Sequence, residues 1–283
     1  MNSSSNRRLR LRLLVLLVGA VGVNVTAPIA QAAVSAAEPA ELVAAVRDID
    51  DGVDRKAKVT MVIVDESGKK RTREFAYASM DVASSDSKTP EEMRMIHMES
   101  PKNVAGTSFL IHSYREQDDK DDDQWVFLPA LRQTRQISTT DKDGAFVGSD
   151  FAMADLERVH VREFSYRSLP DAKVGDKDCY VIEGTAIDKK IERKTGYSKK
   201  VMYIWKDHPV ILQNDFFDKK GRMVKQYFAL RVEKVDDKWS TTQMKMKRAD
   251  SNRETYLIWE NLEYDVGLQS SEFDVGSLAW SSN

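Results

Sequence analysis

The chain has 283 residues, with 43 basic and 45 acidic side chains, one cysteine and a hydrophobic share of 41%. That share supports a real core, which excludes wholesale disorder. The only charges among the first 32 residues are four arginines, so the rest of the chain carries 39 basic and 45 acidic residues. This mildly acidic body argues against a nucleic-acid binder, which would present a basic face.

The first 32 residues have the three-part layout of a secretory signal peptide. Arginines precede the apolar run 13–23, and the small residues Ala30 and Ala32 end the segment. We expect cleavage after Ala32 and a mature domain of residues 33–283. An uncleaved anchor is the alternative, but the run is short of the about 20 residues that a helix needs to cross a bilayer. Arg7-Arg8 lacks the usual continuation of a twin-arginine signal, which favours general secretion.

Cys179 is the only cysteine, so the chain forms no internal disulfide. It lies far from Ala32, whereas a lipid-modified cysteine would follow the cleavage site directly. We therefore expect a soluble, unlipidated protein. Because Cys179 lies within an apolar run, we expect it to be buried in a strand, and a reactive thiol is the alternative.

The pattern along the mature chain predicts a helix followed by a sheet. Apolar residues recur at helical spacing over 39–53, and from residue 57 short apolar or alternating runs lie between polar turns. We expect one mainly β (α+β) domain with about eleven antiparallel strands, and a charged connection at 188–194. The candidate ranges are 58–64, 72–82, 92–99, 107–114, 124–128, 132–139, 161–169, 178–187, 199–207, 210–218, 223–235, 238–247 and 254–263.

The alternation of apolar and polar residues along these runs predicts which face of each strand is exposed to solvent. In 223–235 the even positions are mainly apolar and several odd positions are charged, so we expect one buried face. In 199–207 both faces are apolar, as they are around Trp125 and Met95, which fits a curved sheet with something apolar inside it. Eight of the methionines could line an adaptable cavity or simply fill an irregular core.

Motifs for catalysis are missing. His97, His112, His160 and His208 show no metal-ligand spacing, and no GxSxG, CxxC or phosphate-binding pattern is present. We expect no enzyme activity, catalytic residue, metal or cofactor. The acidic stretch 118–123 lacks the glycine and closing glutamate of a calcium loop, so a solvated hairpin loop is favoured.

The least ordinary segment begins at Trp125 and ends at Leu156. It contains W-x-F-L-P-A over 125–130, arginines at 132 and 135, and F-x-G-S-D-F-x-x-x-D-L over 146–156. Gly148 allows unusual backbone angles, and Ser149 or Asp150 could cap the short helix that follows. We interpret 144–155 as a lid-like loop that Arg132 or Arg135 holds shut through Asp150 or Asp155. The alternative is that these residues only fix a loop on the rim.

This motif resembles that of the outer-membrane lipoprotein-sorting-like proteins, in the superfamily of the Lol-type (LolA/LolB-like) periplasmic carriers. The resemblance implies an unclosed half-barrel of curved antiparallel sheet, covered by helices and enclosing a hydrophobic cavity for acyl chains. It also implies a periplasmic location, lipid or acylated lipoprotein as cargo, transient membrane contact and an RND/MMPL-type transporter as partner. A monomer that binds no nucleic acid is expected.

The candidate site residues follow from the motif and from aromatic and methionine alternation. For the cavity or lid they are Met95, Phe109, Trp125, Phe127, Phe146, Phe151, Tyr203, Trp205 and Phe228. For the lid motif they are Arg132, Arg135, Gly148, Ser149, Asp150 and Asp155.

Three function classes remain open from the sequence. The first is a carrier that moves lipid or lipidated cargo between the inner and outer membranes. The second is a non-enzymatic accessory or sensor subunit that binds a transporter or regulator. The third, a hydrolase, has the least support because no nucleophile–histidine or paired-carboxylate pattern is visible.

Overall fold

The computed structural model describes residues 38–83, 86–138 and 142–282. The predicted signal peptide and its cleavage site lie outside these residues. Within them, no helix is both long and apolar enough to cross a membrane.

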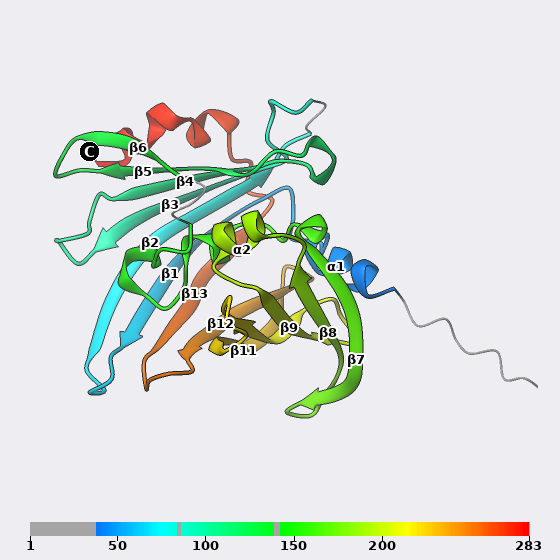
Figure 1. The fold of residues 1–283 in the computed structure, drawn as a ribbon. Coiled ribbons are helices and arrows are strands. Elements are labelled where there is room, and N and C mark those ends of the chain that lie inside the picture. Colours follow the sequence, from blue (N-terminus) through cyan, green and yellow to red (C-terminus); the bar gives the residue numbers. More distant parts are fainter. Residues whose placement is uncertain (1–37, 84–85, 139–141, 283) are drawn as a thin grey trace, which may run out of the picture. The chain divides into compact units, whose positions relative to one another are not determined.

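Thirteen strands form one antiparallel sheet in the order β6-β5-β4-β3-β2-β1-β13-β12-β11-β10-β9-β8-β7 (Figure 1). The first half comprises β1 (Asp54–Val64), β2 (Lys70–Asp81), β3 (Glu92–Ser100), β4 (Ser108–Ser113), β5 (Asp123–Leu128) and β6 (Gln133–Ile137). The second comprises β7 (Phe164–Val174), β8 (Lys177–Ala186), β9 (Lys199–Trp205), β10 (Ile211–Phe217), β11 (Met223–Val235), β12 (Lys238–Arg248) and β13 (Glu254–Tyr264). Every candidate range overlaps a strand, and the expected count of about eleven was too low.

Two meanders of consecutive strands make up this sheet, and they meet where β1 pairs with β13. Their register runs from Arg55 opposite Tyr264 to Val64 opposite Glu254. The outermost strands, β6 and β7, do not pair with each other. The prediction of a single unclosed antiparallel sheet is therefore confirmed.

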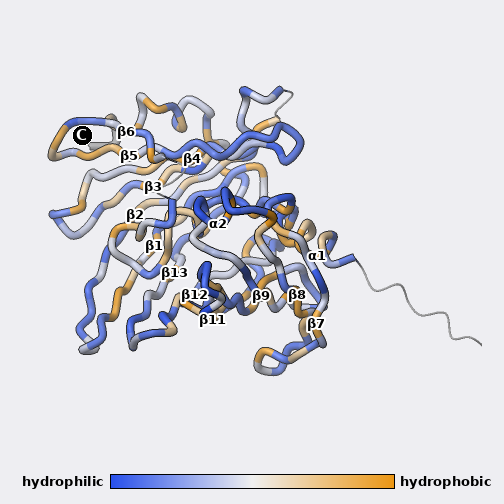
Figure 2. Tube along the Cα trace, viewed as in Figure 1, coloured by the Kyte–Doolittle hydropathy of each residue, from blue (hydrophilic) through white to orange (hydrophobic). Residues whose placement is uncertain are grey.

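One helix is shorter than the sequence pattern indicated, and a second was not predicted. Helix α1 spans Pro39–Arg47 and ends at Asp48, before Val53, which is 64% exposed. The charged run expected as a connection instead forms helix α2 (Lys189–Thr195), because the Asp188 side chain accepts the amide of Ile191 and Gly196 closes the helix with a φ of 80°. Figure 2 shows that α2 is largely hydrophilic.

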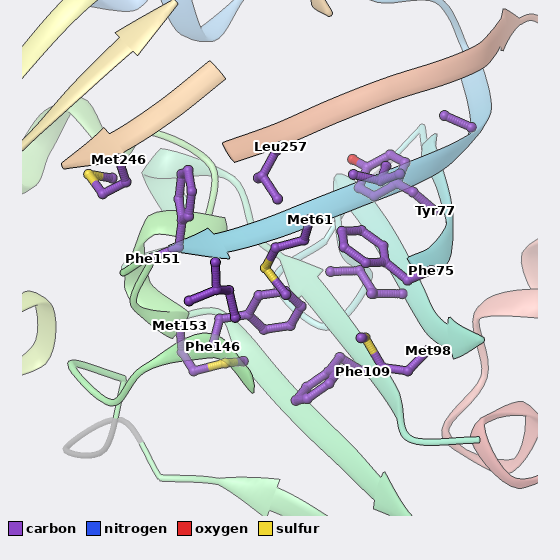
Figure 3. Close-up of a cluster of buried hydrophobic side chains, with 14 of the residues drawn as sticks. Met61, Phe75, Tyr77, Met98, Phe109, Phe146, Phe151, Met153, Met246 and Leu257 are labelled. Atoms are coloured by element: carbon purple, nitrogen blue, oxygen red, sulfur yellow. The ribbon is translucent and has the colours of Figure 1, made fainter. Parts of the chain in front are cut away.

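The connection from β6 to β7 runs from one free edge of the sheet to the other. We call residues 142–163 the crossover segment; it contains the short 3₁₀ turns Phe146–Gly148, Met153–Leu156 and Val161–Glu163. Phe146, Phe151 and Met153 pack in one cluster with residues from both halves of the sheet. Figure 3 shows Phe146 close to Met61 and Phe109, and Phe151 on the side of Met246. The crossover segment therefore covers one face of the sheet and ties its halves together.

The opposite face of β3–β5 is covered by the end of the chain. Phe273 and Leu278 are almost fully buried there and pack against Met93 and Leu110. In Figure 1 this terminal stretch, coloured red, lies beside β5 and β6. The two faces of the first meander thus have different covers.

Candidate functional site

The Gly-Ser-Asp-Phe motif forms a tight hairpin inside the crossover segment. The amide of Phe146 donates to the carbonyl of Phe151 at 2.8 Å, and Ser149 donates its amide to Phe146 at 2.9 Å. Gly148 adopts a φ of 74°, a region that suits glycine. Phe146 makes edge contacts with Phe109 and Phe75, at centroid distances of 5.1 and 6.1 Å. The hairpin is thus seated on the sheet by a buried aromatic ring.

Asp150 fixes the tip of this hairpin to β13. Its Oδ2 accepts the Thr255 hydroxyl at 2.7 Å, its amide donates back to Thr255 Oγ1 at 3.1 Å, and its Oδ1 accepts Arg253 Nε at 3.2 Å. The prediction that Arg132 or Arg135 binds Asp150 is therefore wrong. β6, which carries Arg135, is an edge strand, and five strands lie between it and β13.

Asp155 forms the second anchor of the crossover segment. Its Oδ2 accepts Lys225 Nζ at 2.5 Å and the Ala152 amide at 2.7 Å, and its Oδ1 accepts the Tyr197 hydroxyl at 2.8 Å. Lys225 also donates to the Asp150 carbonyl at 3.1 Å. Asp155 itself closes the short turn at Ala152, so the expectation that Ser149 or Asp150 caps it is wrong.

A cavity of about 490 Å³ lies between the crossover segment, the end of α1 and the sheet. Its size falls in the range of ligand pockets. The wall comes from nearly every strand, because the curved sheet turns the same face of both meanders inward. Its apolar side chains include Ile96, Phe151, Met202, Phe216, Tyr227, Met244, Met246, Leu257 and Trp259.

Charged groups at one part of this wall are paired with one another. Arg94 binds Glu92 through two short contacts, and Arg158 and Arg55 lie 3.5 and 3.7 Å from the same carboxylate. Burial acts to raise the pKa of Glu92, but these arginines outweigh it and the pKa is lowered. Asp81 nearby shows the reverse, because burial and the charge of Glu92 raise its pKa to about 6.

A second polar cluster joins the crossover segment to the β4–β5 loop. His160 Nε2 lies 3.0 Å from Asp122 Oδ1, and Lys142 donates to the Asp122 carbonyl at 2.7 Å and to Glu157. Lys194 binds Glu163 at 2.6 Å. Ligand atoms of Asp122, Glu157 and His160 lie within 4.8 Å of one another, a spacing that suits a metal ion. The ammonium of Lys142 already supplies the positive charge at this position.

Three polar groups in the described part of the cavity wall have no polar partner. Asn214 Oδ1 and Trp259 Nε1 are buried without a hydrogen bond. Lys200 is half-buried and faces only rings, with its ammonium 4.6 Å from the Phe164 centroid and 5.4 Å from that of Tyr197. Burial lowers the pKa of Lys200.

The predicted site residues fall into distinct places. Phe151 and Asp155 line the cavity, and Phe109 of β4 and Phe146 of the crossover segment lie in one buried cluster. The residues on the face covered by the end of the chain are Met95, Trp125 and Phe127. Tyr203, Trp205 and Phe228 alternate along their strands with the cavity-lining residues Met202 and Tyr227. They therefore point to the face of the sheet away from the cavity. The cavity-or-lid role of these nine residues stays a prediction.

Several site residues were missed because they are charged residues in the interior. Lys225 is 4% exposed although it stands on the charged side of 223–235, so the expected burial of the even face alone was wrong. Asp122 is 1% exposed within the stretch expected to be a solvated loop. In both cases the buried partner comes from the distant crossover segment, which a local pattern does not show. Cys179, by contrast, is fully buried in β8, as predicted.

The chain is similar to a protein family model and to several solved structures. A family model described as an uncharacterized protein matches residues 90–280. A DUF1329 family protein from Desulfovibrio piger is 35% identical, with a TM-score of 0.77 over 85% of this chain and 97% of that chain. A domain described as outer membrane lipoprotein-sorting, from Vibrio parahaemolyticus, is 28% identical, with a TM-score of 0.76 over 85% and 97%.

A LolA superfamily protein from Nitrosomonas europaea shares 16% identity, with a TM-score of 0.65 over 84% of this chain and 98% of that chain, and so shows the fold alone. No curated protein is significantly similar to the sequence. The resemblance drawn from the motif is confirmed. The chain belongs to the DUF1329 family, and its fold is that of the LolA superfamily.

Proposed function

We propose that the protein is a non-enzymatic periplasmic carrier that shields the apolar chain of a lipid, a lipoprotein or another hydrophobic molecule. The observation that supports this most directly is the cavity of about 490 Å³ beneath the crossover segment. Methionines form part of its wall, and their flexible thioether chains adapt to ligands of varied shape. Each methylene shielded from water lowers the free energy by about 0.8 kcal/mol, so a buried chain is carried stably through an aqueous compartment.

The way the crossover segment is attached supports a role as a lid. No strand ladder joins its hairpin to the sheet; its polar anchors there are Asp150 and Asp155, which bind side chains of β11 and β13. Because this segment is attached through side chains and not through a strand ladder, it can move without breaking the hydrogen bonds between strands. Cargo would enter and leave when these contacts open at a membrane, with an RND/MMPL-type transporter as the proposed donor or acceptor.

The first test is native mass spectrometry of protein purified gently from periplasm, followed by organic extraction of whatever accompanies it. A stoichiometric lipid or acylated species would support the carrier and name its cargo. If the protein is empty and also takes up neither fatty acid nor phospholipid, the carrier is rejected. The accessory or sensor subunit then becomes the better explanation.

A pair of variants tests whether the cavity is where the cargo binds. Met244→Trp fills space in the cavity wall, and Met223→Trp makes the same change at a residue of β11 that is 40% exposed and outside the cavity. We expect Met244→Trp to weaken binding of the neutral fluorophore N-phenyl-1-naphthylamine at least tenfold, with Met223→Trp unchanged. Equal binding by both variants would place the ligand elsewhere.

A further inference from the structure

The cavity has one cation that the protein leaves unpaired. Four Lys or Arg side chains line it: Arg55, Arg94, Arg158 and Lys200. The three arginines all lie within ion-pair distance of Glu92. Lys200 is the exception among these four, because the described structure gives it neither an ion pair nor a hydrogen bond. An ammonium that has left water without a counter-charge is costly, so such a group calls for an anion.

The carboxylates with the largest electrostatic effect on Lys200 are those of Asp155, Glu163 and Glu157. Each of them is already bound to another lysine. Asp155 holds Lys225, Glu163 holds Lys194 and Glu157 holds Lys142. These three carboxylates are therefore engaged elsewhere, and no carboxylate of the described fold forms an ion pair with Lys200.

A second unsatisfied group lies beside it on the same face. Met202 pairs with Asn214 across β9 and β10, and Lys200 pairs with Phe216. Lys200 and Asn214 are therefore diagonal neighbours, for which a Cα separation of about 7–8 Å is typical. Asn214 is 8% exposed and its Oδ1 has no partner. The amide can present its NH₂ group instead by rotating about its last bond.

We infer that Lys200 and Asn214 form the head-group site of the cavity, and that the cargo is an amphiphile whose apolar chain ends in a carboxylate or a phosphate. This rests on the proposed carrier function and specifies its ligand. Lys200 supplies the charge and Asn214 a hydrogen bond. The rings of Phe164, Tyr197 and Phe216 hold the ammonium in place when the site is empty. The chain then extends along Met202, Met244 and Leu257.

The test displaces N-phenyl-1-naphthylamine with three ligands of equal chain length: dodecanoate, dodecyl phosphate and dodecanol, each below its micelle concentration. We expect the protein to bind at least one of the two anions about tenfold more tightly than the alcohol. Whichever anion binds more tightly identifies the head group. Acetate and inorganic phosphate, which lack the chain, should not displace the fluorophore at the same concentrations.

Variants then assign the preference to Lys200. Lys200→Met should remove the preference for the anion and leave dodecanol binding unchanged, whereas Lys200→Arg should keep the preference. Lys199→Met is the matched control, because Lys199 points to the other face and pairs with Glu183 at 3.2 Å. Lys200→Gln repeats the test if Lys200→Met does not fold.

The outcomes separate this inference from the carrier function. Equal affinity for dodecanol and both anions, unchanged in Lys200→Met, would overturn the head-group site while the carrier stands. An anion preference that survives Lys200→Met would also overturn it. Failure of the fluorophore and all three ligands to bind would reject the carrier and this site together.

Discussion

Lys225 of β11 and Asp155 of the crossover segment form a buried ion pair, with 2.5 Å between Nζ and Oδ2. Both side chains are less than a tenth exposed. The pair is one of the polar anchors of the crossover segment on the sheet. The Asp155 carboxylate also accepts hydrogen bonds from the Tyr197 hydroxyl and from the Ala152 amide.

Lys225→Met should destabilise the protein by about 3–5 kcal/mol, because it leaves a buried carboxylate without its cation. The measurement is urea unfolding. Lys220→Met, at an exposed residue of the β10–β11 turn, is the control and should change little. The double variant with Asp155→Leu should lose less than the sum of the two single variants. Additive losses would show that the two residues do not act on each other.

Gly148→Ala should cost about 1–2 kcal/mol. The φ of 74° is unfavourable for any residue with a Cβ, and the added carbon would meet only Arg73 at an ordinary 3.7 Å, so strain in the backbone is the main cost. Thermal unfolding measures the loss. Gly276→Ala has no positive φ and no neighbour within 4 Å, and should leave the melting temperature unchanged. Equal melting temperatures for the parent and Gly148→Ala would contradict the strained hairpin.

His160→Gln should reduce stability at pH 6 and much less at pH 9. Burial lowers the pKa of His160, but the hydrogen bond and charge of Asp122 outweigh it, so the pKa is raised above the unfolded value of about 6.5. The stabilisation is therefore complete below pH 6.5 and disappears as the pH rises through the folded value. Melting temperatures of variant and parent at each pH give the difference.

His97 provides a control of opposite sign for this experiment. Burial lowers its pKa, so the folded protein resists protonation of His97. His97→Gln should therefore be relatively more favourable at pH 5 than at pH 8. A parallel pH dependence for the two variants would mean that Asp122 does not hold the proton on His160.

Cys179 should react with a thiol reagent only when the protein unfolds. Its side chain is fully buried, and burial raises the pKa of the thiol, so little thiolate is accessible in the native state. Labelling with 5,5′-dithiobis(2-nitrobenzoate) should be slow in buffer and complete in urea. Rapid labelling of the native protein would return Cys179 to the alternative of a reactive thiol.

The strand ranges were predictable because alternation and turn chemistry are local. Residues 223–235 form β11 with the same limits as predicted, since charged turns bound the run on both sides. Helix α1 was predicted too long because Ile49 continues the apolar spacing, whereas the chain leaves the helix at Asp48. Local spacing thus gave the strands and helix α1, but not the last turn of α1 and not helix α2.

The site was harder to predict because its contacts join residues far apart in the sequence. The motif drew attention to Asp150 and Asp155, but their partners lie far along the chain: Lys225 is 70 residues after Asp155, in β11, and Arg253 is 103 residues after Asp150, just before β13. A lysine in a strand ordinarily points to water, so Lys200 and Lys225 gave no signal of burial. Register across the sheet decides their direction, and one residue of slip would reverse it.

The pairing of β1 with β13 bears on the order in which the molecule can assemble. Because β1 ends at Val64 and β13 begins at Glu254, the ladder that joins the two meanders forms only after nearly the whole chain has emerged from the ribosome. Until then β1 is a long edge strand with an open row of hydrogen-bonding groups, which invites pairing with other chains. Chains truncated before residue 254 should therefore aggregate, and a holding chaperone would be needed most during this interval.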